Sequence, residues 1–454
     1  MKTADFYSWL CHGANPDSVC FFDDKCAMQG KQFNQLISHY TKILSEHKAK
    51  SWLVHAQNSD WFAIGLVSAI LAGKTVILPA NTQPETLNKM RTLVEAELSP
   101  TPSFSESDAL HLQKVERFAH EMWPASSDLG RLILYTSGSS GEPKAIEKSI
   151  CQLAAEIENL ERCFSADFAS EDTRIYSTVS HQHIYGLLFK VLWPLVTGRA
   201  IFIPLISYPE VLFDAFHSRK NKVLISSPAF LERLTSEKTN GFNKLLVFSS
   251  GGPLSFKGAS LSQEVLGVHP IEVFGSTETG GIAYRQQVSN NTTWQPFPKV
   301  NVTCDAKSKR LRIQSPYLHN TDWYECDDKI SIEDTGKFRL LGRIDRIVKI
   351  EEKRVSITAM EKYLLQHSDI EQAVITVLEH TRRQLAAVIV FKPSGEKQLQ
   401  KMGKFQQSRL LKQYLSKEFE LVTLPRKWRF VSQIPLSSQG KRDQSALREL
   451  FEHD

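Results

Sequence analysis

The sequence predicts an α/β protein with a large N-terminal domain and a small α+β domain at the C-terminal end. Three observations support this: short apolar runs that end in small polar residues, helical patterns between those runs, and a change of texture beyond Gly342. Short apolar runs closed by Gly, Ser and Pro are typical of buried strands that end in loops. Strands that alternate with helices form mostly parallel sheets, whose ligands bind at the carboxyl ends of the strands.

Four apolar runs show this pattern, and each is followed at once by turn-forming residues. They are residues 132–135 before TSGSSGEPK, 223–225 before SSPAF, 245–248 before SSGGP, and 271–274 before GSTETG. Because the runs are short and strongly apolar, we expect buried strands. The segments rich in glycine and hydroxyl groups then lie where a ligand site is expected.

A helix is expected directly after Ser149. Five apolar residues share one helical face there: Ile150, Leu153, Ala154, Ile157 and Leu160. Ser149 and Gln152 have the spacing of a capping box, in which each side chain accepts a hydrogen bond from the other residue's backbone N–H.

The chain beyond Gly342 reads as a separate domain of about 110 residues. It contains a predicted helix around 358–366 and predicted strands at 372–378 and 385–391. An amphipathic helix is expected to follow, with Leu410, Leu411, Tyr414, Leu415 and Phe419. We therefore predict a domain over 1–343 and another over 344–454. The second carries 20 basic and 14 acidic side chains, a net charge of +6.

Composition excludes several classes of protein. The chain has 454 residues, 41% hydrophobic and 23% charged, as in ordinary globular proteins. Its seven cysteines contain no Cys-x-x-Cys pair, which argues against a zinc ribbon or a disulfide framework and favours a reducing compartment. The longest apolar run, 61–73, is too short to span a bilayer, and no signal-peptide pattern begins the sequence. We expect a soluble, cytoplasmic protein without membrane insertion, and the net charge of +5 gives no argument for nucleic acid.

The segment 136–144, TSGSSGEPK, has four hydroxyl groups, two glycines and a lysine directly after a predicted strand. Glycines let a backbone approach a ligand closely, and N–H and hydroxyl donors suit phosphate oxygens. It is not a Walker A loop, because no Gly-Lys-Ser/Thr ends it. By composition alone such a turn is more often a flexible loop than a ligand site.

The order of the residues in this segment resembles the phosphate-binding signature of the adenylate-forming superfamily, which includes acyl- and aryl-CoA synthetases, luciferases and nonribosomal-peptide adenylation domains. Other motifs similar to those of the family follow in order along nearly the whole chain. They are His183-Ile-Tyr-Gly186, Gly251-Gly-Pro-Leu254, Phe274-Gly-Ser-Thr-Glu-Thr-Gly280, Gly342-Arg-Ile-Asp-Arg-Ile-Val-Lys349 and Pro435-Leu-Ser-Ser-Gln-Gly-Lys441.

The resemblance implies roles for residues around ATP. Around the triphosphate it places Thr136, Ser137, Gly138, Ser139, Gly141 and Lys144. Thr277 would bind the α-phosphate and Glu278 would hold Mg²⁺, since a carboxylate suits a triphosphate only with a hard cation between them. Lys441, on a mobile lid domain, would bridge the attacking carboxylate and the phosphate. The remaining nucleotide-binding residues implied are Gly251, Phe274, Gly275, Asp328 and Arg343.

The resemblance also implies a small β-barrel within the large domain, a hinge at Asp345, and a substrate pocket. The pocket residues are His183, Tyr185, Ser227, Ser276 and Gly281. The sequence departs from the family pattern at three places: Phe274 replaces the usual tyrosine, Cys326-Asp327 replace a Thr-Gly pair, and Glu352 replaces a hinge glycine.

The implied activity is ATP-dependent conversion of an aryl or acyl carboxylic acid to its acyl-adenylate. The acyl group would then pass to a phosphopantetheine thiol, and the basic C-terminal region favours an acyl carrier protein as its bearer. Two alternatives stay open: a ligase that uses free CoA, and a catalytically impaired ligand-binding relative. A P-loop NTPase or a kinase is excluded, because the sequence lacks their motifs.

Overall fold

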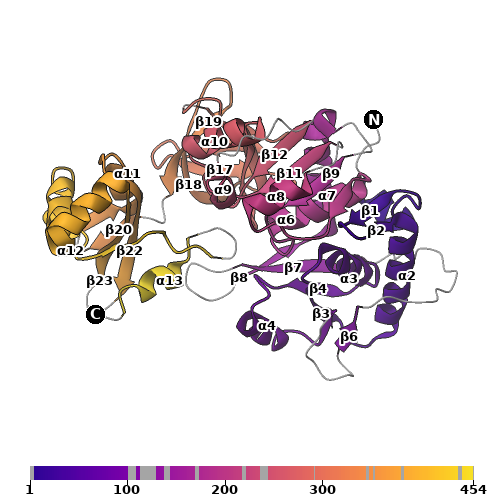
Figure 1. The fold of residues 1–454 in the computed structure, drawn as a ribbon. Coiled ribbons are helices and arrows are strands. Elements are labelled where there is room, and N and C mark those ends of the chain that lie inside the picture. Colours follow the sequence, from indigo (N-terminus) through magenta and orange to yellow (C-terminus); the bar gives the residue numbers. More distant parts are fainter. Residues whose placement is uncertain are drawn as a thin grey trace. The chain divides into compact units, whose positions relative to one another are not determined.

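The computed structural model describes residues 5–100, 109–112, 129–136, 144–168, 173–216, 221–235, 244–290, 292–343, 347–350, 353–379, 383–437 and 442–452 (Figure 1). These residues form a mixed α/β fold, which confirms the predicted class. The chain divides into two compact units, the first made of 1–301 and 313–324 and the second of 302–312 and 325–454. Residues 302–312 and 325–343 thus group with the C-terminal unit. A lid domain that begins at residue 344 stays a prediction.

The largest sheet lies in the first unit and has nine strands. Their order is β15 (Gln295–Pro296), β14 (Gly280–Gln286), β13 (Ile271–Ser276), β12 (Leu245–Ser249), β11 (Lys222–Ser226), β9 (Arg174–Ser177), β10 (Ala200–Phe202), β1 (Val19–Phe22) and β2 (Ala27–Gln29). The strands from β13 to β1 run parallel, and antiparallel strands cover both ends. Three of the four predicted runs are the neighbours β11, β12 and β13, so the parallel arrangement expected from the sequence is confirmed.

The second sheet of this unit has six strands. Their order is β6 (Ala109–His111), β5 (Ala96–Ser99), β3 (Ser51–Val54), β4 (Thr75–Leu78), β7 (Arg131–Thr136) and β8 (Lys144–Lys148). The fourth predicted run is β7, which pairs antiparallel with β8, with Thr136 opposite Lys144. The motif 136–144 therefore leads from the end of one strand to the start of its hairpin partner.

The long apolar run is a core helix of this unit. It forms α3 (Ser59–Leu71), in which every residue except Trp61 is buried. Helix α2 (Gly30–Glu46) packs against it, and Ser59 Oγ donates a hydrogen bond to Ile203 O beside the nine-stranded sheet. Among the helices that the structure describes, none is both long enough and apolar enough to cross a membrane.

Helix α5 (Ile150–Phe164) begins as the sequence predicts. Ser149 is its N-cap, and both hydrogen bonds of the capping box with Gln152 are present. Its far end contributes Phe164 to an aromatic cluster against the nine-stranded sheet, with ring centroids 5.0 Å from Phe248 and 5.3 Å from Tyr284. The remaining helices of the unit are α1 (Phe6–His12), α4 (Pro84–Arg91), η1 (Ser165–Phe168), α6 (Ile184–Gly186), η2 (Leu187–Leu192), α7 (Trp193–Val196), α8 (Pro209–Ala215), α9 (Pro228–Leu231) and α10 (Phe256–Leu266).

The second unit contains three further sheets. Four strands form one sheet, most of whose residues group with this unit: β16 (Asn301–Cys304), β17 (Arg310–Gln314), β18 (Tyr324–Ile332) and β19 (Phe338–Arg343). The small barrel is expected within the large domain, at no stated residues. The other strands are the pair β20 (Ile347–Ile350) and β21 (Lys353–Ser356), and the three-stranded set β22 (Ile370–Glu379), β23 (Arg383–Phe391) and β24 (Lys427–Phe430). The helices are α11 (Ile357–Leu365), α12 (Pro393–Leu415), η3 (Leu421–Thr423) and α13 (Gln444–Glu449).

The predicted C-terminal elements match α11, β22, β23 and α12, with two corrections. Helix α12 ends at Leu415, so Phe419 lies beyond it and packs on the core from the following turn. Leu410 is 41% exposed, because Leu411 and Leu415 occupy the buried face. Gly403 also interrupts the helix with a positive φ of 78°, a conformation that glycine adopts without strain.

The capping box of α5 gives a test of this local structure. Ser149→Ala removes the acceptor for the Gln152 N–H and should lower the free energy of unfolding by about 1 kcal/mol, measured by denaturant titration. Ser149→Asp keeps an acceptor and serves as the control, with stability close to wild type. Equal losses in both variants would contradict a capping role.

Candidate active site

The carboxyl ends of three neighbouring strands meet at one edge of the nine-stranded sheet. Ser250, directly after β12, links them: its N–H donates to Ser226 O of β11 at 3.4 Å, and its hydroxyl donates to Val273 O of β13 at 2.8 Å. Three predicted site residues, Ser227, Gly251 and Ser276, therefore lie along this edge. Parallel α/β sheets bind ligands at this position.

A tight turn follows β13 and carries Thr277 and Glu278. Ser276 and Thr279 close it reciprocally, because Ser276 N–H donates to Thr279 Oγ1 at 3.0 Å and Thr279 N–H donates to Ser276 Oγ at 3.2 Å. A Cβ added at Gly275 would lie 2.2 Å from Gly280 O, a distance that no side chain tolerates. Glycine at position 275 is thus required by the close approach of the two ends of the turn.

An ion pair joins the two motifs. Lys144 Nζ of β8 lies 2.9 Å from Glu278 Oε1, although the residues are 134 positions apart. The side chains are 58% and 27% exposed, so the pair borders solvent. Burial tends to raise the pKa of Glu278, but hydrogen bonds from Lys144, its own backbone N–H and Ser276, together with the positive charge of Lys144, give a lowered value. Glu278 is therefore a carboxylate at neutral pH.

Two buried charged residues support this turn, and the sequence analysis did not identify either. Lys148 of β8 is 2% exposed and donates hydrogen bonds to Glu278 O at 2.9 Å and to Tyr317 O at 3.1 Å. Glu156 of α5 is 5% exposed, and its Oε1 accepts from Gly281 N–H at 2.7 Å. A sequence signal exists, since Gln152, Glu156 and Asn159 form a polar stripe at helical spacing beside the apolar face.

The predicted pocket residues His183 and Tyr185 lie at the start of a π-helical segment. His183 precedes α6, which continues into η2. The Tyr185 ring is 4.9 Å from Phe189, whose ring is 5.2 Å from Phe248 of β12. Burial raises the pKa of the Tyr185 hydroxyl well above its ordinary value, so this group is neutral. Single π-turns inside helices are frequent at functional sites.

Phe274 and Gly251 also lie at this edge of the sheet. The half-buried Phe274 ring is 5.5 Å from Trp294. Gly251 has a φ of +91°, and a Cβ there would meet no atom within 4 Å, so the glycine is required by the backbone conformation rather than by crowding. The part that these residues play in nucleotide binding stays a prediction.

Asp328 and Arg343 lie opposite one another on the antiparallel strands β18 and β19 of the second unit. Arg343 Nη2 lies 3.7 Å from Asp327 Oδ2, and Arg310 Nη2 donates to Asp327 Oδ1 at 2.7 Å. Cys326, which replaces the expected threonine, is buried, and this burial is the largest cause that raises the pKa of its thiol to about 12. The strand pairing thus explains how two residues 15 positions apart come together. Their ribose-binding role stays a prediction.

Several predicted residues lie outside the described part of the chain. They are Ser137, Gly138, Ser139, Gly141, Asp345, Glu352 and Lys441. Thr136 and Lys144, the described residues that flank 137–143, form the last pair of the β7–β8 ladder. Thr136 Oγ1 lies 3.5 Å from Lys144 O.

The residues around Glu278 fit a magnesium ion that takes most of its ligands from substrate and water rather than from the protein. Within the described ranges, no group of three or more His, Cys, Asp or Glu side chains gathers as a metal cluster. Mg²⁺ commonly binds one or two carboxylates and completes its shell with substrate phosphates and water. A single ionised Glu278, 27% exposed, fits that use and does not fit an all-protein cage.

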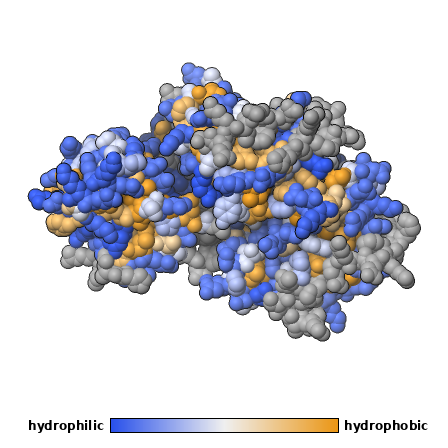
Figure 2. Space-filling model, in the orientation of Figure 1, coloured by the Kyte–Doolittle hydropathy of each residue, from blue (hydrophilic) through white to orange (hydrophobic). Residues whose placement is uncertain are grey.

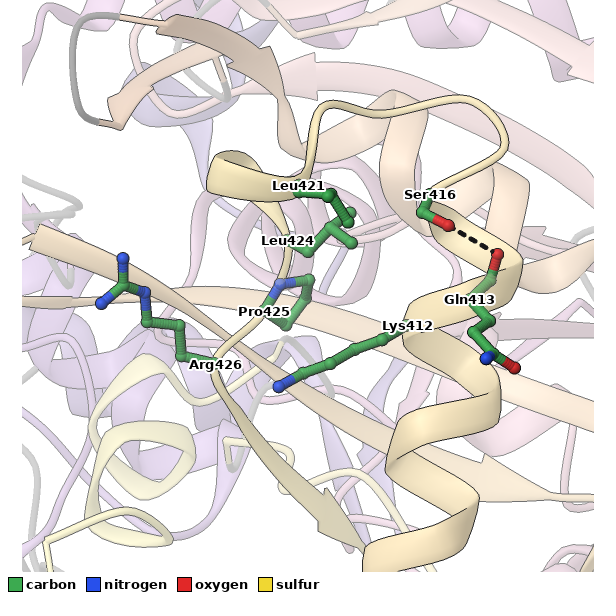
Figure 3. Close-up of a pocket in the computed structure, with 7 residues that line it drawn as sticks. All are labelled: Lys412, Gln413, Ser416, Leu421, Leu424, Pro425 and Arg426. Atoms are coloured by element: carbon green, nitrogen blue, oxygen red, sulfur yellow. Dashed lines mark hydrogen bonds between the residues drawn. The ribbon is translucent and has the colours of Figure 1, made fainter.

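A shallow pocket of about 300 Å³ lies on the second unit, between the end of α12 and η3 (Figure 3). Lys412 extends across it from α12 toward Pro425, while Arg426 lies on the other side and Leu421 stands at its rim. Leu421 is 77% exposed. Hydrophilic side chains gather over the α11 and α12 end of this unit (Figure 2). The pocket therefore combines an apolar rim with two basic side chains.

Comparison with known proteins agrees with this geometry. The family model "AMP-binding enzyme" matches residues 13–307. The match covers more than half of the chain, so the chain belongs to the AMP-binding enzyme family, the adenylate-forming superfamily that the motifs indicate.

The proteins similar to the chain include two curated relatives and one solved structure. The 4-coumarate–CoA ligase of Cereibacter sphaeroides is 24% identical over 262 residues, 57% of this chain but only 59% of that ligase. The D-alanine–D-alanyl carrier protein ligase of Lactococcus lactis is 22% identical over 95% of this chain and 96% of its own length. An ATP-bound RpMatB–BxBclM chimera has the same fold, with a TM-score of 0.78, 17% identity and 99% coverage of both chains.

The Lys144–Glu278 pair predicts a pH dependence of stability. Because the pKa of folded Glu278 lies below its ordinary value of 4.5, its stabilisation is complete above that pH and is lost as the pH falls through the folded value. Wild type and Glu278→Gln should therefore differ most in midpoint of thermal unfolding near neutral pH and converge toward pH 3. A constant difference from pH 7 to 3 would contradict the lowered pKa.

Proposed function

We propose that this protein uses ATP to convert an aryl or acyl carboxylic acid into an acyl-adenylate and then transfers the acyl group to a phosphopantetheine thiol. The observation that carries the proposal is the 2.9 Å ion pair between Lys144 and Glu278. It brings the segment that resembles the phosphate-binding signature to the segment that resembles the metal-binding one. Membership of the AMP-binding enzyme family supports the same reaction.

In the first step a carboxylate oxygen of the acid attacks the α-phosphorus of ATP. The bond from that phosphorus to the bridging oxygen breaks, and pyrophosphate leaves. The protein contributes by positioning two anions and by neutralising charge in the transition state. Lys144 would contact the phosphates, Thr277 the α-phosphate, and Glu278 would hold Mg²⁺. When bound, this ion would offset the negative charge of the phosphates and the leaving group.

In the second step the sulfur of the thiol attacks the acyl carbon of the adenylate. The bond to the AMP oxygen breaks, AMP leaves, and the thiol proton passes to solvent. We propose that Lys441 acts in the first step and that rotation at Asp345 then moves it away. Hinges of this kind use a few residues that absorb large backbone changes.

The acid would bind between aromatic and small side chains. Tyr185 packs on Phe189 and through it on β12, while Ser227, Gly251 and Gly281 are small. A wall of this kind suits an aryl acid or a modest acyl chain. The similarity to a 4-coumarate–CoA ligase supports the aryl class.

For the thiol we propose an acyl carrier protein as the bearer. Carrier proteins are generally acidic, and residues 344–454 carry a net charge of +6. The pocket with Lys412 and Arg426 offers a basic surface beside the exposed Leu421. Complementary charges raise association rates and are screened by salt. The similarity over nearly the full length to a carrier protein ligase favours this acceptor, and free CoA is the second candidate because of the CoA ligase relative.

The central test is exchange of labelled pyrophosphate into ATP with a panel of aryl, short-chain and medium-chain carboxylic acids. An acid that stimulates exchange identifies the substrate class. If no acid stimulates exchange while ATP binds, the protein is the impaired ligand-binding relative.

Lys441→Ala should reduce adenylation by ~10²–10³-fold and leave ATP affinity nearly unchanged, because the residue would act in the transition state. The measurement compares carboxylate-dependent pyrophosphate release with calorimetric ATP binding. The neighbouring Arg442, which pairs with Glu361 at 3.0 Å, offers a control in Arg442→Ala. An unchanged rate of release in Lys441→Ala would remove this lysine from the mechanism.

The acceptor is tested by charge reversal. The double variant Lys412→Glu, Arg426→Glu should lower kcat/KM for a phosphopantetheinylated carrier about tenfold at low salt, with less effect at high salt, while pyrophosphate exchange stays at the wild-type rate. Lys397→Glu, an exposed site nearer the other end of α12, is the matched control. Efficient, salt-insensitive transfer to free CoA, with none to any carrier, would overturn the carrier assignment.

A further inference from the structure

We propose that Lys148 and Glu156 are positioning residues that hold the turn 276–281 against β8 and thereby fix the place where Thr277 and Glu278 meet MgATP. The inference rests on the proposed function and deepens it. Neither residue belongs to the motifs that predicted the site, and both are charged groups buried behind it.

Lys148 connects two separate parts of the chain behind the site. Its ammonium group donates to the carbonyl of Glu278 at 2.9 Å and to the carbonyl of Tyr317 at 3.1 Å. Burial lowers the pKa of Lys148, whereas the negative charges of Glu156 and Glu278 act in the opposite direction. A buried ammonium is costly unless hydrogen bonds and opposite charges compensate it, and here both are supplied by the residues that shape the turn.

The pleat of β8 directs two lysines to the same residue. Lys144 and Lys148 are four positions apart on a strand, so their side chains leave on the same face. Lys144 contacts the carboxylate of Glu278, and Lys148 contacts its backbone carbonyl. The strand therefore fixes both the backbone and the side chain of the proposed metal-binding residue.

Glu156 fixes the other end of the turn from α5. Its carboxylate accepts from Gly281 N–H at 2.7 Å, and a Cβ added at Gly280 would lie 2.8 Å from Oε2. The close fit requires glycine at 280, where φ is +67°. Asn159, one turn further along α5, donates to the hydroxyl of the buried Tyr317 and to Pro298 O. The turn is thus attached to β8 on one side and to α5 on the other.

This arrangement separates a positioning role from general stabilisation. Lys148→Met removes the ammonium donor from the carbonyls of Glu278 and Tyr317 and removes the positive charge near Glu156. Glu156→Gln keeps an oxygen acceptor for Gly281 and replaces the other carboxylate oxygen with an NH2 group, so it tests the same site with less disturbance of the fold. Lys222→Met is the matched control, because Lys222 is also 2% exposed but begins β11, at the end of the strand away from the site.

The experiment measures two properties of the full chain. Hydrogen exchange without nucleotide reports the turn, and amides of 276–281 should exchange faster in Lys148→Met and Glu156→Gln than in wild type or Lys222→Met. Calorimetry without any carboxylic acid reports MgATP binding, whose dissociation constant should rise about tenfold in Lys148→Met and remain at the wild-type value in Lys222→Met.

Two results would overturn the inference: unchanged exchange in the turn of both site variants, or MgATP affinity that falls no further in them than in Lys222→Met. If Lys148→Met fails to fold, Glu156→Gln decides by the same criteria. Neither measurement requires turnover. Failure to find an activated acid would therefore count against the proposed function, whereas the positioning role would still be decided by hydrogen exchange and MgATP binding.

Discussion

The attachment of one short turn to the strand beside it is the constraint on which the candidate site depends. The turn 276–281 joins β13 to β14 within the nine-stranded sheet, while Lys144 and Lys148 belong to the six-stranded one. The contacts at Glu278, to its side chain and its carbonyl, join the two sheets at the edge where ligands of α/β proteins bind. These contacts fix the position of β8 relative to the turn for which we propose a metal-binding role.

Buried charge gives this attachment its specificity. A lysine and a glutamate in the interior cost desolvation free energy, which hydrophobic residues of similar size would avoid. Lys148 and Glu156 recover that cost only when Glu278, Gly281 and Tyr317 occupy their observed places, because those groups supply the hydrogen-bond partners. An incorrect arrangement of the turn would leave these buried charged groups without partners. Its free-energy cost is therefore larger than if the turn were held by apolar contacts alone.

The ion pair between Lys144 and Glu278 differs from these buried groups because it borders solvent. Lys144 and Glu278 are partly open to water, so their attraction contributes little to stability. We propose that phosphate oxygens take the place of Glu278 beside Lys144, and that a divalent ion takes the place of Lys144 beside Glu278. Buried polar groups hold the turn in position, and the partly exposed pair is accessible from solvent.

The sequence by itself determined the fold class, the four strands at 132–135, 223–225, 245–248 and 271–274, the capping box of Ser149 and the family. These features follow from local patterns, because apolar runs and turn residues predict the secondary structure of the segment that contains them, and the ordered motifs indicate the family. It missed the end of α12 at Leu415, and it missed Lys148 and Glu156 altogether. The polar stripe of α5 marks Glu156 but not its burial. Because lysine and glutamate are exposed in most proteins, only the packing of β8, α5 and the turn shows that these two are buried. The tertiary structure decided their role because their partners lie up to 169 positions away, a separation that no local pattern encodes.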